Sequence, residues 1–172
     1  MQHDTSNSTR QARQIHLDGV VQGVGFRPLV YRLAAEHSLA GWVLNSTSGL
    51  DVWVEGPAEA VESFCRELVN HPPRLARITR QEITDRAPVG FTGFEIRHSD
   101  SGGKKDALIS PDVAICEDCL SEVMDLKDRR FAYPFTNCTN CGPRYTIVMD
   151  LPYDRANTTM RDFPMCPRCQ RE

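Results

Sequence analysis

Nine residues near the start of the chain, 20–28 (VVQGVGFRP), combine two glycines and an arginine just before a predicted helix. A short glycine-containing turn that leads into a helix presents backbone N–H groups to an anion. Arg27 adds a planar guanidinium, which suits phosphate or carboxylate oxygens. A strand–Gly–x–Gly–helix pattern is more often plain turn geometry, so the motif alone is weak evidence for an anion site.

Asn45 is the candidate for a second polar group facing this turn. It ends a strand-like run at 42–45, directly before residues 46–49, which have turn chemistry. A neutral amide can accept from a water molecule and donate to an oxyanion, so it can orient an attacking water. The alternative is that Asn45 only initiates the turn, and without further evidence that simpler role is favoured.

The elements that must position these residues follow from hydrophobic periodicity. Alternation predicts strands, with Leu50, Val52 and Val54 on one buried face, and apolar stripes at helical spacing predict two helices. The order is β-α-β-β-α-β with an extra strand, an α+β, ferredoxin-like sandwich. The predicted strands are 13–19, 42–45, 50–55, 76–84 and 93–98, the helices are 28–38 and 58–70, and 146–154 is a further candidate strand.

Composition and charge divide the 172-residue chain and limit its partners. We expect residues 1–12 to form a polar, disordered lead-in, 13–98 the sandwich, 99–108 a linker, and 109–172 a cysteine-rich region. The net charge of -3 argues against nucleic acid, because a phosphate footprint usually makes a domain basic. No apolar run approaches the ~20 residues that span a membrane, so neither a membrane nor nucleic acid is an expected partner.

Six of the seven cysteines form three CxxC pairs, and the seventh, Cys65, is expected in the core. Without an export signal, paired CxxC indicates metal ligation and a cytoplasmic protein. Two pairs separated by eighteen residues predict a structural zinc finger at 116–141. A third pair either begins a second, truncated finger at 166 or interleaves with the first, and the sequential arrangement is favoured. The finger ligands are Cys116, Cys119, Cys138 and Cys141, and the third pair is Cys166 and Cys169.

The motif VVQGVGFRP, followed by GWVLN at 41–45, resembles the acylphosphatases over residues 15–98. The resemblance implies hydrolysis of a mixed carboxylic–phosphoric anhydride without a metal or a protein nucleophile. Arg27 would clamp the phosphate and Asn45 would hold the hydrolytic water. Gly25 departs from the family, where many members carry a larger residue, and predicts a more flexible loop. The implied phosphate-binding residues are Gln22, Gly23, Val24, Gly25, Phe26 and Arg27.

The segments SPDVAICEDCLSE, RRFAYPFTNCTNCGPRYTI and PYDRANTTM are similar to the amino-terminal part of the HypF carbamoyltransferases, which mature nickel–iron hydrogenases. This resemblance implies carbamoyl phosphate as substrate, further ATP-using domains beyond this chain, and HypE as the partner that receives the carbamoyl group. The alternative is a catalytically weak docking module, whose zinc finger recruits those domains or HypE.

Overall fold

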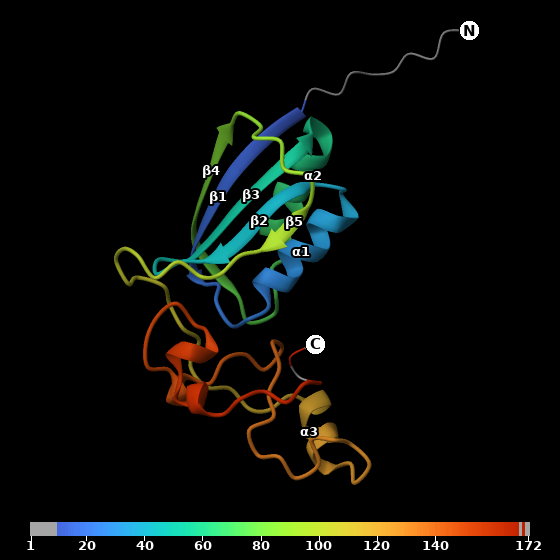
Figure 1. The fold of residues 1–172 in the computed structure, drawn as a ribbon, viewed down its shortest axis with the longest axis vertical. Coiled ribbons are helices and arrows are strands. Elements are labelled where there is room, and N and C mark those ends of the chain that lie inside the picture. The colour runs from blue at the N-terminus through green and yellow to red at the C-terminus, as the bar shows by residue number, and fades with distance from the viewer. Residues whose placement is uncertain (1–9, 169, 171–172) are drawn as a thin grey trace, which may run out of the picture.

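The computed structural model describes residues 10–168 and 170, and it confirms the predicted ferredoxin-like fold (Figure 1). A five-stranded sheet has the order β4-β1-β3-β2-β5, in which β2 and β5 are parallel and the other neighbours antiparallel. The elements are β1 (Arg10–Val20), α1 (Phe26–Glu36), β2 (Ala40–Asn45), β3 (Leu50–Pro57), α2 (Ala58–Asn70), β4 (Arg77–Arg86) and β5 (Phe94–Ile96).

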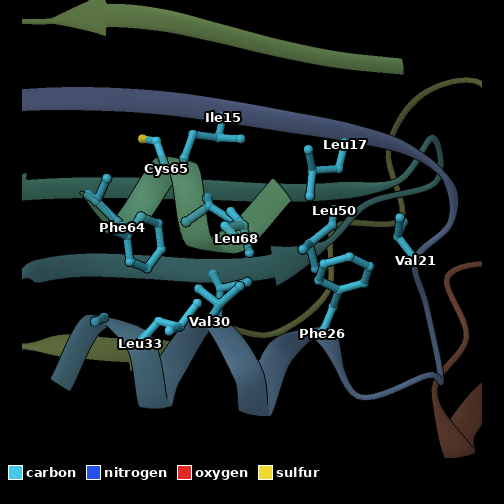
Figure 2. Packing of buried hydrophobic residues seen from close by; sticks show 14 of the residues in the cluster. Ile15, Leu17, Val21, Phe26, Val30, Leu33, Leu50, Phe64, Cys65 and Leu68 are labelled. Carbon is cyan, nitrogen blue, oxygen red and sulfur yellow. The ribbon is translucent and has the colours of Figure 1, made fainter. Parts of the chain in front are cut away.

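The core lies between the two helices and one face of the sheet (Figure 2). Alternation in β3 buries Leu50, Val52 and Val54 completely, as the sequence predicts. Helix α2 inserts Phe64 and Leu68 into the same layer, and Cys65 beside them is also buried. This packing fixes β1, α1, β2 and β3, and therefore fixes the β1–α1 loop and the β2–β3 turn, which lie at the same end of the sheet.

Several boundaries differ from the sequence prediction. Strand β1 begins at Arg10 because its first residues pair with the end of β3, which runs to Pro57. Helix α1 begins at Phe26, so Arg27 lies in its first turn. The candidate strand at 146–154 is wrong: the chain forms a 3-10 turn at Tyr145–Ile147 and a single bridge between Val148 and Thr158.

The cysteine-rich segment lies at the end of the sheet where the β1–α1 loop emerges (Figure 1). It contains one α-helix, α3 (Glu117–Met124), and 3-10 turns at Tyr145–Ile147, Arg155–Asn157 and Thr159–Asp162. The stretch before this segment contacts the β2–β3 turn. There the backbone carbonyl of Thr47 accepts hydrogen bonds from the backbone N–H groups of Asp106 and Ala107, both at 3.0 Å. Within residues 10–168 and 170, no helix has the length and apolar character needed to cross a membrane.

A buried carboxylate holds the chain that connects β4 to β5. Glu55 is 0 % exposed and accepts hydrogen bonds from the backbone N–H groups of Val89, Gly90 and Phe91 at 2.7 to 2.8 Å. Burial opposes ionisation of Glu55, but these N–H groups and the indole of Trp53 lower its pKa below the ordinary value. The ionised form is therefore the one that the fold stabilises.

Replacement of this carboxylate should destabilise the fold in a pH-dependent way. Glu55→Gln removes the charge from three N–H donors, so we expect the free energy of unfolding at neutral pH to fall by about 2 kcal/mol. Because the folded pKa is lowered, the parent loses this advantage as pH falls through that pKa, and the two proteins converge in acid. Urea unfolding across pH 3 to 7 measures the difference. Glu82→Gln, on the exposed face of β4, is the matched control and should change stability little.

Candidate functional site

The loop between β1 and α1 has the backbone geometry of an anion cradle. Gly23 and Gly25 have φ angles of 71° and 95°, a region in which side chains other than glycine are strained. Gly25 is the residue from which α1 starts. The backbone N–H groups of residues 23–27 make no hydrogen bond to any residue in the described part of the chain. Such amides at a helix start can converge on an anion.

Four of the six predicted phosphate-binding residues differ in the direction that they can face. The side chains of Val24 and Phe26 belong to the hydrophobic core and are 1 % exposed, so only their backbone can face a ligand. Figure 2 shows Phe26 in this core. Gly23 and Arg27 instead line a hollow of about 310 Å³ at the surface of the loop. Its opposite wall comes from the cysteine-rich segment, through Thr139, Gly142, Pro143, Tyr153, Asp154 and neighbouring residues.

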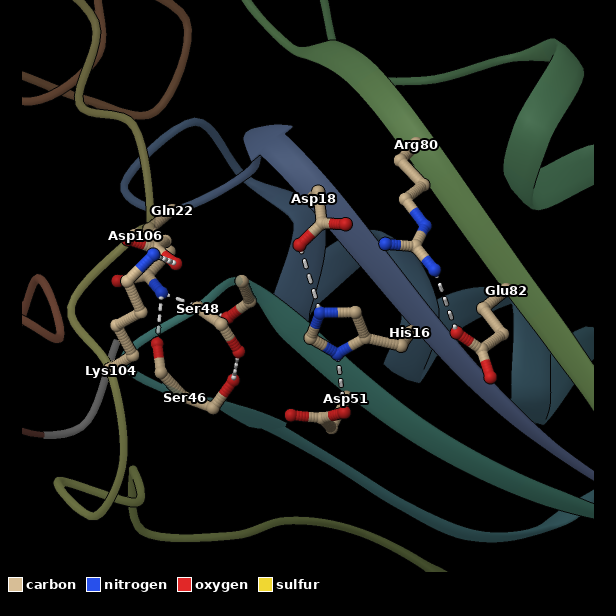
Figure 3. Close-up of polar contacts among 11 residues, drawn as sticks. His16, Asp18, Gln22, Ser46, Ser48, Asp51, Arg80, Glu82, Lys104 and Asp106 are labelled. Carbon is tan, nitrogen blue, oxygen red and sulfur yellow. Dashed lines mark hydrogen bonds and ion pairs between the residues drawn. The ribbon is translucent and has the colours of Figure 1, made fainter.

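The side chain of Gln22 joins three parts of the chain. It is 1 % exposed, and its amide nitrogen donates to the carbonyl oxygens of Ser46 at 2.6 Å and Gly49 at 2.8 Å (Figure 3). Its amide oxygen accepts from the backbone N–H of Tyr153 at 2.7 Å. Gln22 therefore acts through its hydrogen bonds as a brace, because its side-chain nitrogen and oxygen are both occupied by the backbone.

Asn45 ends β2 beside the turn that Gln22 holds. It is 1 % exposed, and neither its side-chain oxygen nor its nitrogen has a hydrogen-bond partner among the described residues. A buried amide left without partners is uncommon in folded proteins. Asn45 does not line the hollow beside Arg27, so its link to the loop is the short path through Ser46 and Gln22. Its donor and its acceptor are both available for a water molecule or an oxyanion.

Arg27 is held by a residue far away in the sequence. Its Nη2 donates to Oδ1 of Asp154 at 2.9 Å, and the two side chains are 27 % and 30 % exposed. One terminal nitrogen makes this contact, so Nε and Nη1 keep N–H groups that can reach a phosphate. Sequence reasoning identified Arg27 but missed Asp154, since 127 residues separate them.

The four cysteines of the predicted finger come together in one cluster. Their sulfur atoms all lie within 4.8 Å of one another, and those of Cys116 and Cys138 are 3.6 Å apart. Burial raises the pKa of Cys119 and of Cys138. Burial also opposes ionisation of Cys141, but the backbone N–H of Cys138 and the guanidinium of Arg144 lower its pKa to about 6. The surroundings of the cluster therefore favour the thiolate form of Cys141 without a metal ion.

This donor set fits zinc. Four thiolates at about 2.3 Å from a tetrahedral zinc ion would lie about 3.8 Å from one another, which agrees with the observed cluster. With four protein ligands no coordination position remains for substrate, so the site is structural. Of the third pair, Cys166 is exposed and is not part of the cluster, and Cys169 lies outside the described residues.

His16 lies between two carboxylates that the sequence did not suggest (Figure 3). Its Nδ1 is 2.7 Å from Asp51 and its Nε2 is 3.0 Å from Asp18. Burial opposes the charged ring, but these two contacts outweigh it and raise the pKa of His16. Pairing of His16 with Asp51 in the β1–β3 register could have revealed the cluster, since directly opposed residues interact.

The fold and the loop define the class of protein. Residues 13–96 match the acylphosphatase family, and an acylphosphatase of Thermotoga petrophila is 33% identical over 89 residues, 51% of this chain and 98% of that protein. The chain belongs to the acylphosphatase family and carries an enzyme domain of that type. Residues 115–148 match the HypF finger family, in agreement with the four-cysteine cluster.

Longer relatives contain both parts of the chain. Carbamoyltransferase HypF2 of Cupriavidus necator is 48% identical over 157 residues, 89% of this chain and 19% of that protein. A crystal structure of full-length HypF in a phosphate- and nucleotide-bound form is 48% identical with a TM-score of 0.88, over 95% of this chain and 22% of that one. The chain thus spans about a fifth of the length of these HypF carbamoyltransferases.

Zinc content should follow the four clustered cysteines. We expect about one zinc ion per chain, and Cys138→Ser should lose most of it because three thiolates hold the ion less tightly. Elemental analysis of the purified proteins measures the ratio. Cys65→Ser and Cys166→Ser are controls that should keep their zinc. Loss of zinc from Cys166→Ser would instead favour the interleaved pairing of the CxxC motifs.

The charge on His16 should stabilise the fold at low pH. A raised folded pKa means that this stabilisation is present below the unfolded pKa of about 6.5 and is lost as pH rises through the folded value. Asp51→Asn should therefore lower the pKa of His16, as measured by NMR titration, and destabilise the protein more at pH 5.5 than at pH 8.5. Asp85→Asn removes the same charge from exposed β4 and should leave the His16 titration unchanged.

Proposed function

We propose that the first domain hydrolyses carbamoyl phosphate at Arg27 and Asn45. The observation that carries the proposal is the buried amide of Asn45, which has no hydrogen-bond partner among the described residues. The next residue, Ser46, is bonded by Gln22 to the loop whose backbone N–H groups are unbonded in the same part of the chain. Arg27 at the mouth of that loop supplies the fixed positive charge that a phosphate requires. The chemical class follows from the acylphosphatase family to which the chain belongs.

The reaction needs positioning and charge stabilisation. The amides of residues 23–27 and the guanidinium of Arg27 neutralise charge on the phosphoryl oxygens. Asn45 accepts a hydrogen bond from a water molecule and directs its oxygen at phosphorus. The new P–O bond forms as the bond between phosphorus and the carbamoyl oxygen breaks. Carbamate leaves with the electron pair of that bond, and the proton of the water passes to solvent or to a product oxygen.

The role of this hydrolysis in a longer protein is part of the same proposal. The relatives that contain both parts of the chain are HypF carbamoyltransferases. In such a protein, ATP-using domains would take up the carbamoyl group as a carbamoyl adenylate and pass it to a cysteine of HypE. The group would then become a cyanide ligand in nickel–iron hydrogenase maturation. Reduced CxxC pairs that hold zinc support a cytoplasmic location.

Substitution of the two site residues should separate binding from rate. Arg27→Ala should lower kcat/KM for carbamoyl phosphate about 10²-fold or more, because it removes charge stabilisation of the transition state. Asn45→Ala should lower kcat by a similar factor but keep the affinity for inorganic phosphate, because its partner is the water. Phosphate release and competitive inhibition by phosphate measure these effects.

Arg66→Ala is the matched control, since Arg66 is exposed on α2 and its guanidinium donates to the hydroxyl of Ser63, one turn away on the same helix. Its rate should equal that of the parent. Equal rates for Arg27→Ala and the parent would overturn the proposed site. A parent that turns over neither carbamoyl phosphate nor acetyl phosphate, yet binds HypE, would instead indicate a docking module.

A further inference from the structure

The cysteine-rich segment contacts Arg27, a residue of the proposed site, through Asp154. The contacting arm consists of Pro152, Tyr153 and Asp154, and the last two residues contact the β1–α1 loop and the start of α1. A Cβ atom added to Gly23 would come within 2.8 Å of the Tyr153 ring, so the arm and the loop are in close packing. Two residues of the arm, Tyr153 and Asp154, line the same hollow as Arg27.

The arm is fixed from both sides. On the side of the loop, the backbone N–H of Tyr153 donates to the buried oxygen of Gln22 at 2.7 Å. On its own side, Asn157 donates from its side chain to the carbonyl of Pro152 and from its backbone to the carbonyl of Asp154, both at 2.8 Å. These hydrogen bonds hold the backbone of Asp154 in place. Its carboxylate can therefore fix the position of a group that it binds.

The group that it binds is the guanidinium of Arg27. Among the described residues, the carboxylate of Asp154 is the anion found to pair with Arg27. The contact occupies Nη2 and leaves the remaining N–H groups for a phosphate. A carboxylate that holds one nitrogen of an arginine limits the rotamers of the whole side chain, so the other N–H groups keep a fixed direction.

We propose that Asp154 is a positioning residue for Arg27, so that the cysteine-rich segment completes the acyl phosphate site of the first domain. The proposal rests on the proposed function, because it assigns Arg27 to the phosphate. The zinc-bearing segment then takes part in the chemistry of the preceding domain, through a carboxylate that need not touch the substrate.

Kinetics of the zinc-loaded chain test the proposal through a split between kcat and KM. Asp154→Asn keeps the shape of the side chain but weakens the pair, so kcat for acetyl phosphate and carbamoyl phosphate should fall at least about tenfold. KM should not rise, because the substitution also removes a negative charge that repels the phosphate dianion. Asp154→Glu restores the carboxylate and should recover part of the lost rate.

The matched control is Asp150→Asn. Asp150 belongs to the same segment and pairs across to Lys105 at 2.6 Å, so it has an equivalent ion pair that does not involve Arg27. Its kcat should equal that of the parent. A decrease in kcat of the same size in Asp150→Asn, or a parent-like or higher kcat with a lower KM in Asp154→Asn, would overturn the proposal. The latter result would make Asp154 a competing anion.

A second measurement does not depend on turnover. The Nη2–H NMR resonances of Arg27, whose nitrogen donates to Asp154, should be resolved and protected in the parent, in Asp150→Asn and in Asp154→Glu, and exchange-broadened in Asp154→Asn. An unchanged Arg27 resonance in Asp154→Asn would overturn the positioning role even if the protein hydrolyses acyl phosphates. Conversely, a parent without any turnover would remove the proposed function, while this resonance would still report whether Asp154 positions Arg27.

Discussion

The buried side-chain amide of Gln22 is the contact on which the arrangement of this molecule depends. It joins the β1–α1 loop to the β2–β3 turn through Ser46 and Gly49, and to the cysteine-rich segment through Tyr153. A buried amide is costly unless its donors and acceptor are satisfied, and here both donor hydrogens and the oxygen have partners. Any other relative placement of the three segments would leave part of this amide unpaired, so the contact selects one arrangement.

The sandwich follows the usual rules of folding, whereas the candidate site departs from them. The core buries its apolar side chains almost completely and is as regular as the sequence pattern suggests. At the end of the same sheet, Asn45 is buried without partners and the loop amides of residues 23–27 are unbonded within the described structure. Proteins tolerate such local violations where they carry out function, because a rigid scaffold maintains them.

Hydrophobic periodicity was sufficient to predict the ferredoxin-like element order and the extent of α2, and the spacing of two CxxC pairs was sufficient to predict the four clustered cysteines. The Arg27–Asp154 pair could not be predicted in this way, since it joins two segments whose docking depends on tertiary packing. The contact of His16 with Asp51 depends on the register between β1 and β3, which the sequence does not state directly, whereas Asp18 lies two residues along the same strand. The candidate strand at 146–154 did not form. In the described part of the chain its residues pair with no strand, apart from the single bridge between Val148 and Thr158.

The four-cysteine cluster and the β1–α1 loop are neighbours, and this connects metal binding to the first domain. The turn that carries Cys138 and Cys141 also carries Thr139, whose side chain would lie 3.2 Å from a Cβ atom added to Gly25. Directly after that turn, Pro143 packs against Gly23. Cys138 and the residues after it line the hollow beside Arg27, so a zinc ion held by the two cysteines would also fix a wall of that hollow. A zinc ion without an open coordination position could thus influence the proposed acyl phosphate site through packing alone.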